Sequence, residues 1–242
     1  MTVNTPPEFD DNAVPDEPED EAEAPETDYT EPRFTVYRGS SSDPTFGYLI
    51  ALALAVGSMA LPGDQRDLRY TLLWMVVAGF GVLAWLVGSR MQRIGQETPE
   101  NLAWGVVFAL IIAVPMLAVG GNTLTTTVSL LFAGMSSGML LAYLVFVMPL
   151  AETLFFRGLL QEDYPFWLVA LMSSLWGGVM FFPLLDITNF PAVILVLALG
   201  LVMINVIYSY VRRRNGLAAA WICQLVVNLV LIFIPYTSSI GG

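Results

Sequence analysis

Seven apolar segments, each near the length of a membrane-spanning helix, follow one another from residue 46 onward. A bilayer core offers no water to backbone N–H and C=O groups, so a chain that crosses it must satisfy them internally, and about 20 apolar residues make one helical crossing. We therefore predict an all-α, polytopic membrane helix bundle. Its expected spans are about 46–61, 70–89, 102–121, 128–149, 165–185, 191–210 and 217–236.

The first 44 residues have a different composition from the rest of the chain. Twelve of the 21 acidic residues lie between Glu8 and Glu31, in a stretch without apolar periodicity. Such a segment cannot bury enough apolar surface to offset the entropy lost on ordering. We predict that residues 1–44 form a disordered acidic tail and that residues 45–242 form the transmembrane helical domain.

The distribution of charge argues against nucleic acid as a partner and is typical of a protein from a salty environment. Once the acidic stretch Glu8–Glu31 is set aside, nine acidic residues face ten arginines, so the rest of the chain is nearly neutral and carries no basic footprint for nucleic acid. The expected partners are the lipid bilayer and a membrane-embedded peptide or protein. The chain contains no lysine and has a pI near 4.2, a balance typical of salt-adapted proteins.

Arginine positions predict the orientation in the cell membrane, because short cytoplasmic loops are enriched in basic residues. With a cytoplasmic N-terminus and an external C-terminus, seven arginines fall inside and two outside. The inside set is Arg33, Arg38, Arg90, Arg93, Arg212, Arg213 and Arg214, and the outside set is Arg66 and Arg69.

The chain has no histidine and a single cysteine, Cys223. Histidine is the commonest metal ligand and the commonest general base near neutral pH, and one cysteine cannot build a thiolate cluster. We therefore expect no cofactor and no bound metal.

Glu152 is the acidic residue that most needs an explanation, because it continues an apolar span. A carboxylate at that depth costs several kcal/mol unless it is paired, hydrated or protonated, so it marks a functional interior by default. On a regular α-helix, Arg157 is turned about 140° away from Glu152. Arg157 is therefore expected to extend toward Glu162, Asp163 or the cytoplasmic interface.

The stretch Pro149–Gln161 resembles the first motif of the CPBP family of intramembrane proteases, which includes CAAX prenyl endopeptidases and bacteriocin-immunity-type proteins. That motif is Glu-Glu-x-x-x-Arg, usually ending Phe-Arg-Gly-Leu-Leu. Glu152 stands at the first glutamate and Arg157 at the arginine, whereas Thr153 replaces the second glutamate.

Two later segments are similar to the remaining motifs of the family. Trp176 and Met180 occupy the places of the aromatic residue and the histidine in Phe-x-x-x-His, and Gln224 and Asn228 occupy those of His-x-x-x-Asn. The three motifs place a CPBP-like core at about 128–236. The resemblance implies peptide hydrolysis inside the membrane, in which the glutamates and histidines activate a water and the asparagine helps to hold the oxyanion.

The substitutions at these positions leave three functional interpretations. Methionine, glutamine and threonine cannot accept a proton near neutral pH, which favours a catalytically silent or weakened family member, a pseudoenzyme that binds peptides, lipids or a membrane partner. The first alternative is an active endopeptidase that uses Glu152 in an unusual arrangement. The second is a transporter or cation-binding protein with Glu152 as the proton or cation site.

The helical rise places three polar side chains at similar depth. Gln224 and Asn228 are spaced i, i+4 and so lie on one helix face, where both amides are expected to reach the carboxyl of Glu152. Met180 is expected to lie deeper. A purely structural interpretation remains open, in which the three polar groups bond one another and set the helix register.

Overall fold

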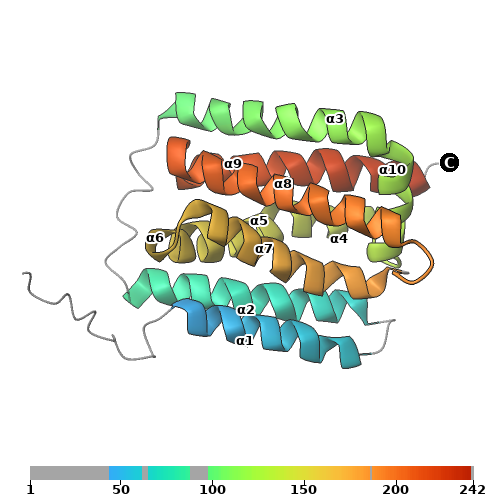
Figure 1. Cartoon of the computed structure of the whole chain (residues 1–242), viewed down its shortest axis with the longest axis horizontal. Coiled ribbons are helices and arrows are strands. Elements are labelled where there is room, and N and C mark those ends of the chain that lie inside the picture. Colours follow the sequence, from blue (N-terminus) through green and yellow to red (C-terminus); the bar gives the residue numbers. More distant parts are fainter. Residues whose placement is uncertain (1–43, 62–64, 88–97, 186, 241–242) are drawn as a thin grey trace, which may run out of the picture. The chain divides into compact units, whose positions relative to one another are not determined.

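The computed structural model describes residues 44–61, 65–87, 98–185 and 187–240. The predicted tail lies outside these residues, except for Pro44, which begins the first helix. Helix accounts for 91% of the structure and no strand occurs in the described part. The prediction of an all-α membrane bundle is confirmed, and its seven rods lie roughly antiparallel (Figure 1).

Several rods join more than one labelled helix. The fourth comprises α4 (Ser137–Ala142), α5 (Met148–Glu152) and α6 (Gln161–Asp163), linked by π-helical segments, and the seventh comprises α9 (Leu217–Asn228) and α10 (Ile234–Ile240). The others are α1 (Pro44–Gly57) with a 3-10 turn (Ser58–Ala60), α2 (Arg66–Val87), α3 (Pro99–Leu131), α7 (Phe166–Phe181) with a 3-10 turn (Phe182–Leu184), and α8 (Pro191–Asn215).

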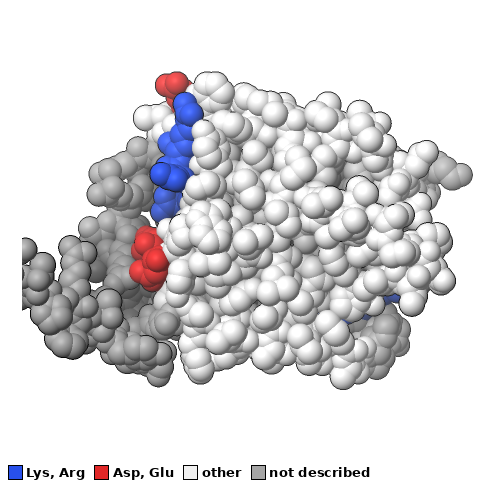
Figure 2. Space-filling model, in the orientation of Figure 1, with Lys and Arg blue, Asp and Glu red and all other residues white. Residues whose placement is uncertain are grey.

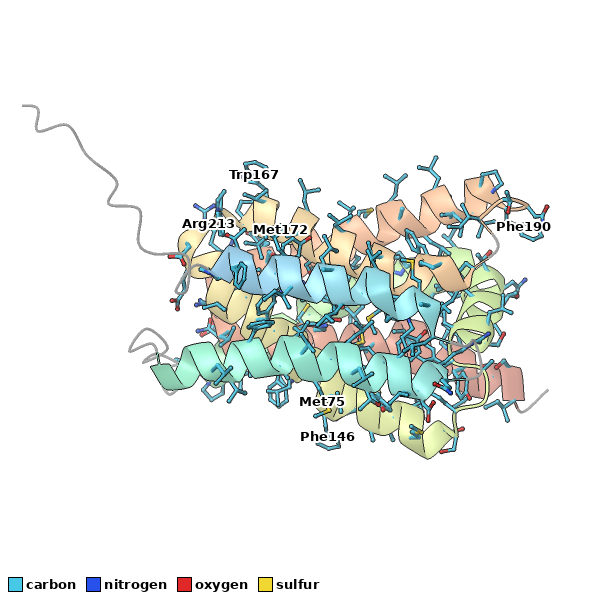
Figure 3. The ribbon with its side chains drawn as sticks, turned by 90° about the horizontal axis from the view of Figure 1, so that it is seen from below. Met75, Phe146, Trp167, Met172, Phe190 and Arg213 are labelled. Carbon is cyan, nitrogen blue, oxygen red and sulfur yellow. The ribbon has the colours of Figure 1, made fainter. Side chains whose placement is uncertain are left out.

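Five rods are long and apolar enough to cross a membrane, judged on the described residues alone. They are α3, the fourth rod, α7 with its 3-10 turn, α8 and the seventh rod, while Pro44–Ala60 is a shorter apolar helix. The outward-facing surface of the bundle is apolar: Met75 on α2 and Phe146 in the fourth rod, for example, are 64% and 67% exposed and project from the bundle (Figure 3).

The boundary between the third and fourth rods differs from the prediction of a span at 128–149. Helix α3 continues to Leu131, and the next rod starts at Ser137. Gly134 turns the chain with φ +87°, a conformation that glycine adopts without the Cβ clash of other residues. Ser136 then caps the new helix, because its Oγ accepts a hydrogen bond from the backbone N–H of Met139 at 3.2 Å.

The fourth rod occupies the middle of the bundle. In its apolar window 56% of the residues are buried, against 22% for α3 and 17% for α8. Helices α1 and α2 lie on one side of it, and α3, α8 and α9 lie on the other (Figure 1). Among the five rods that are long enough to span a membrane, the rod that carries the first motif is therefore the one most shielded from lipid.

Two prolines explain two of the three π-helical segments. The segment Tyr143–Val147 ends two residues before Pro149, and the segment Leu229–Phe233 ends two residues before Pro235. Proline has no N–H and its ring clashes with the carbonyl four residues earlier, so the helix widens to i→i+5 hydrogen bonding at that point. The third segment, Thr153–Leu160, contains no proline and coincides with the first motif.

The two ends of the bundle differ in charge and in the chain ends that they carry. Helix α1 begins at the end where α8 finishes with Arg212, Arg213 and Arg214, and α10 ends at the opposite one (Figure 1). On the face shown in Figure 2, arginines form a stripe at one edge with acidic residues at both ends of the stripe, and most of the remaining surface is uncharged. The protein is thus an integral membrane protein, and the predicted cytoplasmic N-terminus and external C-terminus stay a prediction.

The contact between α3 and α9 yields a sharp stability prediction. A Cβ atom at Gly105 would overlap the backbone oxygen of Ala219, which cannot move without shifting α9. We expect Gly105→Ala to lower the free energy of unfolding by about 2 kcal/mol or more, the usual cost of overpacking. In the same helix, Gly121→Ala meets nothing within 4 Å and should be neutral or slightly stabilising. Thermal unfolding in detergent compares them, and equal midpoints would contradict the close approach.

Candidate functional site

Glu152 ends α5 in the central rod, and its side chain is only 6% exposed. Each carboxyl oxygen accepts one hydrogen bond. The indole Nε1 of Trp74 on α2 donates to Oε1 at 3.2 Å, and the amide Nε2 of Gln224 on α9 donates to Oε2 at 2.6 Å. Three rods therefore converge on one buried carboxyl group, with neutral N–H donors on both of its oxygens.

Thr153 and Gln224 extend this cluster. The hydroxyl of Thr153 donates to Oε1 of Gln224 at 3.0 Å, so the amide is engaged at both its nitrogen and its oxygen. Both side chains are 2% exposed or less. The residues at the positions of the family's second glutamate and second histidine thus lie beside Glu152 and are occupied with each other.

Asn228 contacts a different part of the fourth rod, contrary to the expectation that it would reach Glu152. Its Nδ2 donates to the backbone oxygen of Leu144 at 3.3 Å and lies 3.7 Å from Sδ of Met148. The two residues that could donate to the Leu144 carbonyl within the helix are Met148 and Pro149. The backbone N–H of Met148 donates to the carbonyl oxygen of Tyr143, and Pro149 has no N–H, so the Leu144 carbonyl has no donor within its own helix. The asparagine supplies the missing donor.

Met180 is fully buried in the larger apolar cluster of the bundle. Its backbone carbonyl accepts a hydrogen bond from Nη2 of Arg69 at 3.1 Å, at the end of α7 where helix carbonyls lack partners. Trp176, one turn earlier, lies beside the Glu152 carboxyl, although its Nε1 makes no hydrogen bond of normal geometry. Of the two residues in the second motif, Trp176 is therefore the one that lies next to Glu152.

Arg157 is completely buried, and the expectation that it extends toward Glu162, Asp163 or the interface is wrong. The π-helical hydrogen bonding of Thr153–Leu160 joins residues five apart, which turns Arg157 closer to the face of Glu152 than an α-helix would. Within the described residues, the guanidinium makes no direct hydrogen bond to the Glu152 carboxyl.

A second polar group surrounds the guanidinium of Arg157. Its Nη2 donates to Oδ1 of Asn205 on α8, which also accepts from Ser173 Oγ at 2.7 Å. The guanidinium carbon lies 5.1 Å from the ring centre of Tyr208 and 5.7 Å from that of Phe156, distances of cation–π contacts. Two of its nitrogens, Nε and Nη1, have no hydrogen-bond partner among the residues that the structure describes.

Sequence reasoning missed Trp74, Asn205, Ser173 and Tyr208. None stands at a motif position, and an indole or hydroxyl in an apolar helix is common. The sequence did offer one indication of this second polar group. Asn205 lies in the apolar segment 191–210, and uncharged amides in membrane helices usually form a hydrogen bond to another helix. Nothing in the sequence near Trp74 points to Glu152, which lies 78 positions away.

The chemistry of this arrangement is that of a closed, hydrogen-bonded cluster. The indole and the amide cannot accept a proton at neutral pH, so neither can activate a water by general-base catalysis. The N–H groups aimed at both carboxyl oxygens suit an anionic or neutral acceptor and leave a cation poorly coordinated. Among the described residues, no three His, Cys, Asp or Glu side chains lie together in a way that could hold a metal ion. The donor set does not fit a metal ion.

Residues 134–230 match a family model described as Rce1-like, type II CAAX prenyl endopeptidase Rce1-like. The matched region begins in the turn before the fourth rod and ends in the seventh, so it includes every motif position discussed above. The resemblance to the CPBP family is confirmed over these residues. No curated protein and no solved structure shows a significant match to the chain.

Proposed function

We propose that this protein is a CPBP-like integral membrane protein that has lost its peptidase chemistry, or keeps only a trace of it, and retains the fold to bind a membrane-embedded peptide or protein. The observation that carries the proposal is that both carboxyl oxygens of Glu152 are engaged in hydrogen bonds. Its two carboxyl oxygens accept from Trp74 and Gln224, groups that cannot relay a proton.

Packing around the carboxyl supports the same function. Glu152 and its neighbours Thr153 and Gln224 are buried, and the indoles of Trp74 and Trp176 are at most 1% exposed. An attacking water and a scissile peptide bond both need access to the carboxyl, and these buried side chains cover it. The active-endopeptidase alternative requires them to move apart, and the transport alternative requires an aqueous path through the same packed layer.

A peptidase assay tests the loss of chemistry. Wild type and Glu152→Gln, reconstituted with membrane-anchored peptides, are both expected to cleave no faster than protein-free liposomes. The triple variant Thr153→Glu, Met180→His, Gln224→His restores the family's residues at three positions and should gain cleavage or zinc binding, since imidazole can accept a proton and ligate zinc.

Two results would contradict the proposal in different ways. Robust cleavage by wild type that disappears in Glu152→Gln would establish an active endopeptidase. Uptake of protons or a solute that depends on Glu152, without cleavage by any variant, would favour transport. The binding function is measured separately by energy transfer between labelled peptide and labelled protein in the liposomes, and no transfer at any peptide density would exclude such peptides as partners.

A further inference from the structure

A groove of about 610 Å³ opens at the end of the bundle where α8 finishes and α7 begins. It is separate from the Glu152 cluster, since none of the residues that bond Glu152 lines it. Its wall combines basic, aromatic and polar side chains, principally Arg212, Arg213, Phe166, Trp167, Gln161 and Glu162.

The groove lies at one end of the membrane-spanning helices, and a bilayer places its head groups at the ends of such helices. The arginine stripe runs along one edge of the mostly uncharged surface (Figure 2), and Trp167 and Arg213 project outward at the same end of the molecule (Figure 3). Trp167 is 53% exposed. Tryptophan is enriched at the membrane interface, and arginine beside an apolar belt meets the phosphates of the adjacent leaflet.

Both arginines are held in place before any ligand arrives. The guanidinium of Arg213 lies 5.4 Å from the ring centre of Phe166, and Nε of Arg212 donates to the backbone oxygen of Arg157 at 3.1 Å. No hydrogen bond within the described ranges uses the terminal nitrogens of Arg212. A planar guanidinium held in this way binds phosphate oxygens with little further loss of side-chain entropy.

The charged and polar groups of the groove restrict the chemical class of ligand that it can bind. Among the described lining residues, two arginines and one glutamate give the groove a formal charge of one positive, which matches a single phosphodiester. Gln161 donates through Nε2 to the backbone oxygen of Ser209 at 2.7 Å, whereas its buried Oε1 has no hydrogen-bond partner.

The geometry points to a binding site for the head group of one anionic phospholipid. Arg212 and Arg213 hold its phosphodiester, and Trp167 packs on the upper part of the acyl chains. The Arg157 carbonyl that anchors Arg212 belongs to the first motif, so the lipid site adjoins the central rod.

Lipid titration of the purified full-length protein in a neutral detergent tests this site. Short-chain phosphatidylglycerol is compared with phosphatidylcholine of the same chain length and with inorganic phosphate, at constant ionic strength, and bound lipid is counted by native mass spectrometry. We expect one phosphatidylglycerol per chain, bound at least tenfold more tightly than phosphatidylcholine, and a dissociation constant raised about fivefold by Arg213→Gln and about thirtyfold by the Arg212→Gln, Arg213→Gln double variant.

Arg214→Gln is the matched control. Arg214 is exposed, bonds Tyr210 through Nη1 at 3.0 Å and does not line the groove, so its removal should change lipid affinity less than twofold. The single variant Arg213→Gln keeps the hydrogen bond from Arg212 to the Arg157 carbonyl. Its loss of affinity can therefore be interpreted even if the double variant misfolds.

Three results would overturn the assignment. Equal affinity for the two lipids would show that charge recognition is absent. Inorganic phosphate that binds as tightly as phosphatidylglycerol would identify a phosphate site and not a lipid site. Lipid binding that appears only after deletion of residues 1–31 would make the acidic tail, and not a lipid, the occupant of the groove.

Discussion

Gln224→Leu is expected to lower the free energy of unfolding by about 3 kcal/mol, because it leaves one oxygen of the Glu152 carboxyl buried without a donor. Leucine fills a similar volume, so the loss reports the hydrogen bonds and not a cavity. The variant also removes the acceptor of the Thr153 hydroxyl. Unfolding in mixed detergent micelles, followed by circular dichroism, measures the difference.

Two further variants make this result specific. Asn122→Leu replaces an exposed amide on α3 and should change stability by less than about 0.5 kcal/mol. Adding Glu152→Leu to Gln224→Leu removes the orphaned carboxyl and should recover part of the loss, so a double-mutant cycle should show coupling of at least about 1 kcal/mol. Additive effects would mean that the two side chains do not interact.

Arg157→Ala is expected to destabilise the protein by about 4 kcal/mol, the second large effect. The substitution empties a fully buried site and removes a hydrogen-bond donor to Asn205 and the cation–π contact with Tyr208. Thermal unfolding of the purified protein gives the comparison with wild type, and a loss below about 1 kcal/mol would contradict the packing described here.

Arg157→Met separates packing from charge. Methionine fills much of the space without requiring hydrogen-bond partners, and two nitrogens of the arginine already lack them. Replacing a buried ion by an apolar side chain of similar volume is often close to neutral, so Arg157→Met should retain at least half of the stability lost in Arg157→Ala. Equal losses in the two variants would show that attraction to Glu152, and not packing, keeps the arginine buried.

Local sequence patterns were sufficient for the all-α membrane class, and five of the predicted crossings correspond to described helices that are long and apolar enough to span a bilayer. Apolar length alone predicts seven crossings, since every backbone polar group in a bilayer needs a partner within its own segment. The fourth span was misplaced at its start, because residues 128–131 are as apolar as those after them and only Ser136 and Gly134 mark the true turn. A buried carboxyl at Glu152 and its family motif could also be identified from the chain.

The partners of that carboxyl could be predicted only in part. Gln224 was expected beside Glu152 from helix depth, and it does bond the carboxyl. Asn228, one turn further along, instead satisfies Leu144, whose carbonyl lost its helical donor at Pro149. Proline at 149 is visible in the sequence, but the widening of the helix and the direction of the freed carbonyl depend on which rod packs against it.

The sequence by itself therefore determined that this protein is a helical membrane bundle with a family-like core, because helix formation in lipid depends on local composition. Only the tertiary structure decided that Arg157 turns inward and that Trp74, 78 positions from Glu152, caps its carboxyl. A π-helical segment rotates the arginine relative to α-helical periodicity, and the indole arrives from a rod whose place beside the fourth is set by side-chain packing. Hydrogen bonds between helices follow from that packing, which no pattern along a single segment encodes.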